Sequence, residues 1–137
     1  MTRTTKRVAI VGTGVIGASW SALYLAKGLD VVATDPAPAA EQRLRDFIDK
    51  AWPALERLGL SPGASKSRVS FTADLAEALN GVDFVQENGP ERLDFKQKLY
   101  GQMDALLPPD VIIASSSSGI PMSNIQVGAT AHPERTV

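Results

Sequence analysis

Cysteine is absent from this chain of 137 residues, and histidine occurs only once, as His132. Without cysteine the chain has no disulfide, no thiolate metal ligand and no cysteine nucleophile. A single imidazole also cannot build a histidine-rich metal site, so we expect no bound metal. Because His132 lies in the polar sequence Ala-His-Pro-Glu at 131–134, we predict an exposed turn residue there and not a catalytic base.

The chain also lacks an excess of charge of one sign, since 14 lysines and arginines accompany 15 aspartates and glutamates. The formal net charge of −1 argues against nucleic acid or an anionic membrane as a partner. No apolar run approaches the length of a membrane span. The basic start at residues 1–7 precedes a strand that is too short to be the apolar core of a signal peptide. Since the lack of cysteine also fits a reducing compartment, we expect a cytoplasmic protein.

What the chain does contain is an alternation of short apolar runs and amphipathic stretches, which is typical of βαβ units around a parallel sheet. Its length allows one domain, at residues 1–137, with a sizeable core. Strands are predicted at residues 8–11, 30–34, 68–72, 82–86 and 111–114. Helices are predicted at residues 15–27, from about 39, and at 74–79, 91–107 and 121–126.

Apolar spacing predicts which faces of the two longer helices are buried. In the helix from about residue 39 the predicted stripe consists of Phe47, Ile48, Ala51 and Leu55. In the helix at 91–107 it consists of Phe95, Leu99, Met103 and Leu106. Pro53 should end or kink the first of these helices, because proline lacks the donor NH and crowds the preceding turn. Thr136 and Val137 are typical of the start of a sixth strand, so we expect further sheet and a partner domain beyond Val137.

The segment after the first predicted strand matches the pattern G-x-G-x-x-G and opens a predicted helix. It consists of Gly12, Thr13, Gly14, Val15, Ile16 and Gly17. Gly12 permits the tight turn, Gly14 allows a pyrophosphate to approach the backbone, and Gly17 allows close packing of helix and strand. The NH groups at the start of the helix, at the positive end of its dipole, then hold the phosphates.

Asp35 follows the second predicted strand, 18 residues after Gly17. A carboxylate there accepts hydrogen bonds from the adenosine ribose hydroxyls and repels a 2′-phosphate, and no arginine follows it directly. The combination predicts an α/β domain with a doubly wound parallel sheet of the Rossmann type, which binds NAD in preference to NADP. The alternative, in which the glycines serve only a tight turn and Asp35 only begins a turn with Pro36, stays open.

Other nucleotide sites match the loop less well. A P-loop requires Gly-Lys-Ser or Gly-Lys-Thr after its glycines, whereas Gly17 is followed by Ala-Ser. A flavin enzyme can use the same first unit but normally needs more chain to enclose the flavin ring. A non-catalytic module that binds or senses NAD remains a second class of function.

Two further polar segments should lie at the same edge of the sheet as the glycine loop, because ligands bind outside the carboxyl ends of parallel strands. They are residues 86–92 and 115–119. Glu91, in the first turn of its predicted helix, could simply favour the helix dipole, and Lys96 could be a solvated charge. The serine run could be a flexible loop, a set of helix caps, or a hydroxyl donor that orients a substrate alcohol. No residue here is a strong general base.

Together these motifs resemble the NAD-binding domain of the 3-hydroxyacyl-CoA dehydrogenase superfamily, over essentially the whole chain. Within it, the chain is similar to the branch that oxidises carnitine. The most specific stretches are Gly-Val-Ile-Gly-Ala-Ser-Trp at 14–20, Asp-Pro-Ala-Pro at 35–38, Trp-Pro-Ala-Leu at 52–55, Gln-Glu-Asn-Gly-Pro-Glu-Arg-Leu at 86–93 and Ser-Ser-Ser-Ser-Gly at 115–119.

The resemblance implies roles for four residues near the nicotinamide. Glu91 and Lys96 match family positions that contact the cofactor near its nicotinamide ribose. Ser118 matches the serine that hydrogen-bonds the substrate hydroxyl, and Ser116 occupies a cofactor-side position where relatives often carry asparagine. The catalytic histidine, its glutamate partner and the helical domain that shapes the substrate pocket and dimer interface are expected beyond Val137.

The resemblance further implies a homodimeric dehydrogenase that transfers a hydride from carbon 3 of a small hydroxy acid to NAD. Carnitine is the expected substrate, because relatives that use CoA carry a longer, lysine-rich excursion between the second and third strands. Here that region is short and contains Trp52 and Pro53. L-gulonate and a 3-hydroxyacyl-CoA remain alternatives. These 137 residues alone are expected to bind NAD without turning over substrate.

Overall fold

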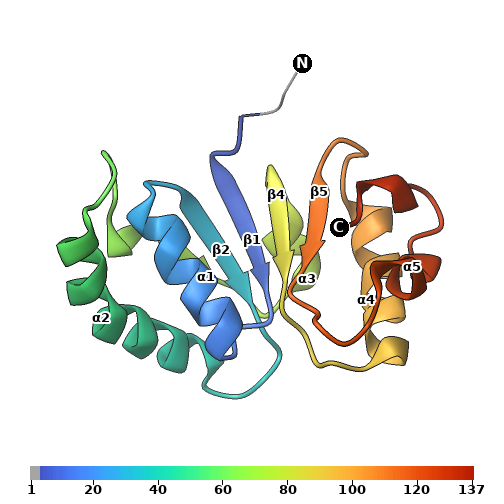
Figure 1. Ribbon diagram of the computed structural model, residues 1–137, viewed down its shortest axis with the longest axis horizontal. Coiled ribbons are helices and arrows are strands. Elements are labelled where there is room, and N and C mark those ends of the chain that lie inside the picture. Colours follow the sequence, from blue (N-terminus) through green and yellow to red (C-terminus); the bar gives the residue numbers. More distant parts are fainter. Residues whose placement is uncertain (1–3) are drawn as a thin grey trace.

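The computed structural model describes residues 4–137 and shows a parallel sheet of five strands with helices on both faces (Figure 1). The strands are β1 (Arg7–Val11), β2 (Asp30–Thr34), β3 (Val69–Phe71), β4 (Phe84–Glu87) and β5 (Ile112–Ser115). Their order across the sheet is β3-β2-β1-β4-β5, which confirms the predicted doubly wound Rossmann sheet. Residues 1–3 of the basic start lie outside the described residues.

Helices cover both faces, so the central strands are buried on both sides. Within residues 4–137 the α-helices are α1 (Val15–Ala26), α2 (Ala40–Leu58), α3 (Leu75–Leu79), α4 (Leu93–Leu106) and α5 (Met122–Ile125). Side chains alternate along β1: Val8 and Ile10 join the core under α1 and α2, and Ala9 and Val11 join the core under α3, α4 and α5. A strand buried on both faces needs apolar residues at every position, which explains why residues 8–11 form an unbroken apolar run.

The connections from β1 and β4 run to opposite sides of the sheet, with α1 and α2 on one side in Figure 1 and α4 on the other. A crevice opens at the carboxyl ends of two such neighbouring strands. Val11, the last residue of β1, pairs with Glu87, the last residue of β4. The loops that follow β1, β2, β4 and β5 therefore meet at one edge of the sheet, at the bottom of Figure 1.

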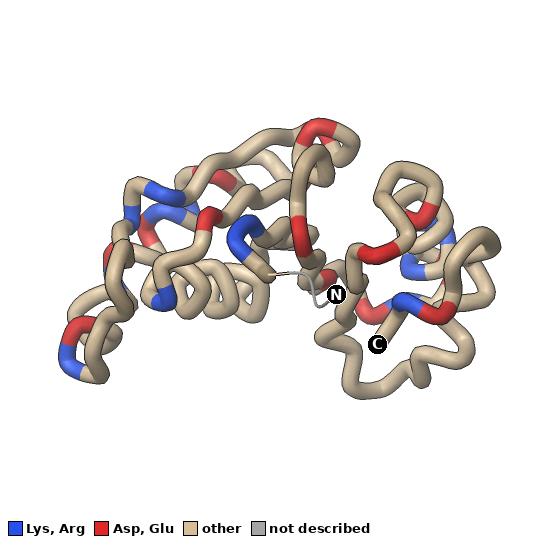
Figure 2. The backbone as a smooth tube through the Cα atoms, turned by 90° about the horizontal axis from the view of Figure 1, so that it is seen from above, with Lys and Arg blue, Asp and Glu red and all other residues tan. Residues whose placement is uncertain are grey.

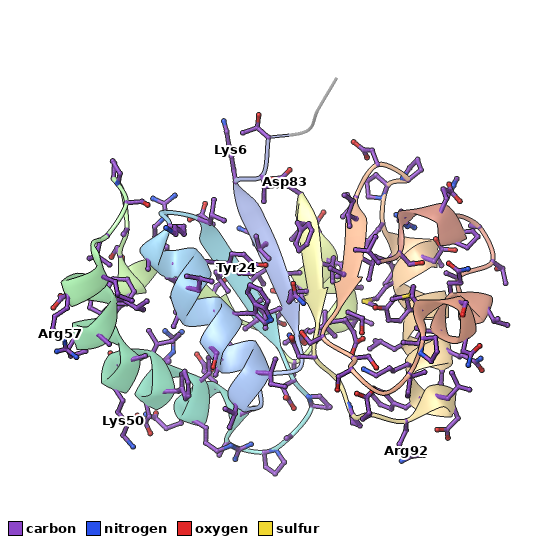
Figure 3. The ribbon with its side chains drawn as sticks, viewed as in Figure 1. Lys6, Tyr24, Lys50, Arg57, Asp83 and Arg92 are labelled. Carbon is purple, nitrogen blue, oxygen red and sulfur yellow. The ribbon has the colours of Figure 1, made fainter. Side chains whose placement is uncertain are left out.

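Acidic and basic residues are interspersed along the chain, as Figure 2 shows. At the opposite edge of the sheet, Lys6 lies beside Asp83, whereas Lys50, Arg57 and Arg92 point outward (Figure 3). One oxygen of Asp83 accepts the NH groups of Lys6 and Arg7, at 2.9 and 3.0 Å, and so holds the start of β1 against β4. No helix within residues 4–137 has the length and apolar composition that a membrane span requires.

Pro53 does not end α2, so the expectation that the helix ends there was wrong. The carbonyl that a helical NH at position 53 would bond belongs to Asp49, and both residues are exposed. That carbonyl can therefore bond water, which removes most of the cost of the missing NH. Ile48 and Trp52, buried before the proline, hold α2 on the sheet, and the helix continues to Leu58.

The buried faces of the two long helices differ in part from the predicted stripes. In α2 the fully buried residues are Ala40, Leu44, Ile48 and Trp52, while Phe47, Ala51 and Leu55 of the predicted stripe are partly buried and pack against the core. In α4 they are Lys96, Leu99, Tyr100, Met103 and Asp104. Phe95 and Leu106 are instead 38% and 49% exposed, so their assignment to the core of α4 was wrong. The prediction counted only apolar side chains, whereas two buried positions of α4 carry charges that are paired inside the protein.

Thr136 and Val137 lie beside β5, as expected for the start of a sixth strand. Thr136 forms a parallel bridge with Ile113, and the NH of Val137 donates to the carbonyl of Ile113 at 3.0 Å. A buried ion pair holds this segment on α4: Arg135 Nη2 donates to Asp104 Oδ1 at 2.6 Å. Both side chains are 3% exposed, and Arg135 also donates to the carbonyls of residues 107 and 108 at the end of α4.

Replacing Asp104 with asparagine should lower the free energy of unfolding at neutral pH by about 3 kcal/mol, because it leaves Arg135 as a buried, unpaired charge. Burial raises the pKa of Asp104, but hydrogen bonds from Arg135 and from the NH groups of Ala131 and His132 more than offset it, so the pKa lies below its ordinary value. The ionised carboxylate therefore stabilises the fold above the unfolded-state pKa, and this contribution is lost as pH falls through the lower folded-state pKa.

Urea unfolding of wild type and Asp104→Asn at pH 7 and in acid measures this dependence. The difference between the two proteins should narrow in acid. A difference that is the same at both pH values would contradict the ionised pair.

Candidate functional site

The glycine loop between β1 and α1 brings helix and strand unusually close together. Gly12 has a φ of 91°, which favours glycine, and its NH bonds the carbonyl of Thr34 at 2.9 Å. A Cβ on Gly17 would lie 1.9 Å from the carbonyl oxygen of Gly12, a distance that no side chain can occupy. The close packing of α1 on this loop thus depends on the first and third glycines of the motif.

Gly14 has a different reason to be glycine. Its φ of −63° is open to any residue, and a Cβ there would meet nothing within 4 Å. The first turn of α1 contains no acidic residue, and no side chain caps its NH groups. Val15 and Ile16 open this helix and are 75% and 56% exposed. An uncapped helix start in front of open space fits a dinucleotide pyrophosphate.

Asp35 is fixed at the end of β2 by three hydrogen bonds. Its Oδ2 accepts from the NH of Thr13 at 2.8 Å and from the hydroxyl of Thr13 at 3.2 Å, and its Oδ1 accepts from the NH of Ala37 at 2.8 Å. The bond to Ala37 belongs to the turn that was expected if Asp35 only began a turn with Pro36. The bonds to Thr13 give Asp35 a further role, because they hold its carboxylate against the glycine loop.

A cleft of about 690 Å³ opens beside this carboxylate, between the loops that follow β1, β2 and β4. Asp35 and Asn88 are among its polar residues, and its apolar wall includes Pro36, Ala37, Ala73, Leu75, Phe95 and Leu99. A flat, largely apolar group with a hydroxyl-bearing ring beside the carboxylate suits this cleft. The glycine loop, Asp35 and this wall therefore fit the adenosine half of NAD.

On the other side of the crevice between the carboxyl ends of β1 and β4, Lys96 forms a buried ion pair with Glu87. Lys96 Nζ lies 2.7 Å from Glu87 Oε2, and the two side chains are 2% and 0% exposed. The interpretation of Lys96 as a solvated charge was therefore wrong. The spacing of residues along α4 could not predict this ion pair, because the partner of Lys96 comes from the end of β4 and not from α4.

Glu87 gathers four hydrogen-bond donors from three parts of the chain. Besides Lys96, they are the NH of Gly89 at 2.6 Å, the hydroxyl of Ser115 at 2.8 Å and the hydroxyl of Tyr100 at 3.3 Å. Burial and the charge of Glu87 raise the pKa of Tyr100, which keeps its hydroxyl protonated as a donor. The sequence analysis placed Glu87 in the polar segment after the fourth strand but did not single it out, since no motif marks a buried carboxylate.

Glu91 lies two residues before α4, so the interpretation as a first-turn residue of that helix was wrong. Its carboxylate accepts from the hydroxyl of Ser117 and from the NH of Ser118, the latter at 3.2 Å. The hydrogen bond from Ser117 is the main cause that holds the pKa of Glu91 below its ordinary value. Glu91 Oε1 lies 4.0 Å from Lys96 Nζ, too far for a direct hydrogen bond.

The serine run is fastened to the loop after β4. Ser116 Oγ lies 2.6 Å from Asn88 Oδ1 and 2.9 Å from Gln86 Nε2. Asn88 in turn reaches the carbonyl of Gly12 at 3.4 Å, which links the serine run to the glycine loop. Ser118 is exposed, and within the described part of the chain its hydroxyl makes no hydrogen bond with the protein.

His132 lies in the predicted turn, as the first residue before a short 3₁₀ helix (Pro133–Arg135). Its Nδ1 lies 3.1 Å from Glu134 Oε1, and its side chain is 41% exposed. Among residues 4–137 there is no group of three His, Asp or Glu side chains that could hold a metal ion.

The topology, the glycine loop and the cleft define a dinucleotide-binding domain of the Rossmann class. The family model of the 3-hydroxyacyl-CoA dehydrogenase NAD-binding domain matches residues 7–137. The chain belongs to this family, and NAD is its cofactor.

Curated relatives with high similarity are named L-carnitine dehydrogenase. Those from Streptomyces coelicolor and Pseudomonas putida are each 52% identical to this chain over 96% of its length, and the one from Streptomyces griseus subsp. griseus is 54% identical over 96%. The chain covers 41%, 41% and 39% of these relatives. It thus spans about two fifths of their length.

Solved structures share the same fold. One is an NAD⁺-dependent dismutase, 5-formyl-3-hydroxy-2-methylpyridine 4-carboxylic acid 5-dehydrogenase, with a TM-score of 0.86 and 39% identity. The match covers 98% of this chain and 43% of that structure. Another is 3-hydroxybutyryl-CoA dehydrogenase from Escherichia coli, with a TM-score of 0.86, 26% identity and coverage of 98% and 29%.

Replacing Gly14 with alanine should weaken NADH binding about tenfold while changing the free energy of unfolding by less than about 1 kcal/mol. The new methyl group projects into open space that the pyrophosphate would take, and it meets no protein atom. Fluorescence titration with NADH and urea unfolding measure the two effects.

Gly17→Ala is the matched comparison, because its methyl group would collide with the carbonyl of Gly12. This variant should lose about 2 kcal/mol of unfolding free energy. Unchanged NADH affinity in Gly14→Ala would contradict the approach of the pyrophosphate to that residue.

Proposed function

We propose that this domain is part of an NAD-dependent dehydrogenase that oxidises the 3-hydroxyl of carnitine to a carbonyl group. The observation that supports it is the placement of two polar sites on one edge of the sheet. The first site, formed by the glycine loop and Asp35, lies on one side of the crevice between β1 and β4. The second site lies on the other side and is formed by Lys96, Glu91 and the serine run. An extended dinucleotide placed across the edge would have its adenosine at the first site and its nicotinamide at the second.

In this proposal the loop of residues 12–17 holds the pyrophosphate and Asp35 accepts the adenosine ribose hydroxyls. Lys96, Glu91 and Ser116 contact the nicotinamide half. The gap of 4.0 Å between Lys96 Nζ and Glu91 Oε1 supports this role, since a ribose hydroxyl placed near both can accept from one and donate to the other. When bound, NAD accepts a hydride from the carbon that bears the substrate hydroxyl.

Ser118 is proposed to hydrogen-bond the substrate hydroxyl. Its exposure and the absence of a side-chain partner among residues 4–137 support this, because the hydroxyl is then free to bind a ligand. The NH of Ser118 is held by Glu91, which fixes the residue beside the proposed nicotinamide site. The hydroxyl proton must pass to a general base, and we propose that this base lies outside these residues, in a helical domain that also forms a homodimer interface.

Carnitine is proposed as the substrate because several relatives at 50% identity or more carry that activity in their names. The region between β2 and β3 contains one long helix, α2, and otherwise only the loops on either side of it with a short 3₁₀ helix (Lys66–Arg68), so it carries no further long excursion to surround a CoA group. L-gulonate and a 3-hydroxyacyl-CoA are the competing substrates. The cytoplasm is the proposed compartment, in keeping with a chain that has no cysteine.

The function is tested by following NADH absorbance with the full-length protein that contains this domain. We expect NADH to form with L-carnitine and NAD, and far more slowly with L-gulonate or 3-hydroxybutyryl-CoA. Faster turnover of either alternative would reassign the substrate. Binding of NADH without oxidation of any of the three would instead favour a non-catalytic NAD-binding module.

Replacing Asp35 with alanine should lower the ratio of NADH affinity to NADPH affinity by about tenfold or more. The substitution removes both the acceptor for the ribose hydroxyls and the charge that repels a 2′-phosphate. Parallel fluorescence titrations with the two dinucleotides measure the ratio of affinities. Asp49→Ala is the control, since Asp49 is an exposed acid of α2 that pairs with Lys66 and does not line the cleft. A ratio that is unchanged in Asp35→Ala would refute this role of Asp35.

A further inference from the structure

Glu87 is the most completely enclosed carboxylate of the described chain, and no role is assigned to it by the family motifs considered above. Its side chain is 0% exposed, so a ligand cannot reach it directly. It does contact the groups that line the proposed nicotinamide site. Lys96 donates to it from α4, and Ser115, the residue that begins the serine run, donates to it from the end of β5.

The arrangement around Lys96 constrains its ammonium group. One hydrogen points to Glu87 Oε2 at 2.7 Å, and a second points to the carbonyl of Gly89 at 3.3 Å. An ammonium group has three hydrogens, so one remains after these two bonds. Glu91 Oε1 lies 4.0 Å from the same ammonium group, and the side chain of Glu91 is 46% exposed whereas that of Lys96 is 2% exposed. The third hydrogen makes no hydrogen bond with residues 4–137, so a ligand hydroxyl that enters beside Glu91 is a suitable acceptor for it.

The same carboxylate also fixes the serine run. Glu87 Oε1 accepts from Ser115 Oγ, and Ser115 Oγ in turn accepts the NH of Ser117 at 3.0 Å. The carbonyl of Glu87 accepts the NH of Ser116 at 2.9 Å. One residue thus sets the position of a lysine from α4 and of a loop from β5 relative to each other.

We propose that Glu87 is a positioning residue for NAD: its buried charge holds the Lys96 ammonium toward the nicotinamide ribose, and its hydrogen bond with Ser115, which an amide can keep, holds the serine run beside it. This inference rests on the proposed contact between Lys96 and the cofactor. Pairing with Glu87 also compensates the charge of a lysine that is almost fully buried, which an unpaired lysine could not sustain.

Glu87→Gln is a suitable variant because the amide can keep every hydrogen bond of the carboxylate. Its carbonyl oxygen can accept from Lys96 and Gly89, and its NH₂ group can donate to the hydroxyls of Ser115 and Tyr100, which accept as readily as they donate. The substitution removes the charge beneath Lys96 and little else. Lys96→Met removes the other member of the pair, and the double variant completes a cycle.

We expect Lys96→Met to weaken NADH binding about tenfold, the loss for one hydrogen bond to a charged group. Glu87→Gln should weaken it about as much, because a buried ammonium group without its counter-charge loses its proton or its position. The double variant should bind NADH no more weakly than Lys96→Met, because Glu87 acts through Lys96. Binding of ADP, which has only the adenosine half, should stay within about twofold of wild type in all three variants. Calorimetric titration with NADH and ADP, beside thermal unfolding, provides these values.

Asp104→Asn is the matched control, since Asp104 is also a buried carboxylate paired with a cation from another segment. It should lose stability and keep its affinity for NADH. If Glu87→Gln behaves in this way while Lys96→Met binds weakly, the pair is only structural and the inference is overturned. Losses that multiply in the double variant, or an equal loss of ADP affinity, would overturn it as well.

If the proposed contact between Lys96 and NAD does not exist, the result differs from these: Lys96→Met would then bind NADH with the affinity of wild type. Should Glu87→Gln alone not fold, the double variant removes both charges together and leaves no unpaired ion. It must then bind NADH as Lys96→Met does, and a further tenfold loss would refute the positioning role.

Discussion

The close approach of α1 to the loop after β1 is the contact on which the site depends. The backbone of Gly17 lies so near the carbonyl of Gly12 that no Cβ fits between them. This contact directs the start of α1 toward the carboxyl edge of the sheet, next to Asp35, and leaves open space in front of Gly14. A larger residue at position 17 would separate helix from strand and remove the anion-binding geometry together with the packing.

The two halves of the edge are built in different ways. On the proposed adenosine side, backbone NH groups and the carboxylate of Asp35 border an open, largely apolar cleft, which suits recognition by shape and a few polar groups. On the other side, charge is buried: Glu87 and Lys96 form an ion pair with almost no solvent exposure. Buried pairs contribute little net stability, but they fix orientation, because each partner has few alternative positions. That property suits a site in which a lysine must meet a defined hydroxyl.

Apolar runs and glycines in the sequence predicted the strands and turns whose positions depend on a few neighbouring residues. The strand at residues 30–34 was predicted with its observed bounds, as was the start of α1, because the strands are buried on both faces and the glycines mark the turns. The expectations that Pro53 ends α2 and that Phe95 and Leu106 are buried were wrong for one shared reason. Each depended on which helix face meets the sheet and which meets water, and that is set by the tilt and rotation of the helix in the assembled domain.

The sequence by itself determined the Rossmann topology, the glycine loop with its acidic residue on the next strand, and through them the cofactor. These features are encoded within short segments whose spacing is sufficient to specify them. Only the tertiary structure decided that Lys96 is buried, that Glu87 is its partner, and that Glu91 precedes α4 and bonds the serine run. Residues from β4, α4 and β5 meet in that network, and contacts between segments far apart in the chain leave no periodic signal in any one of them.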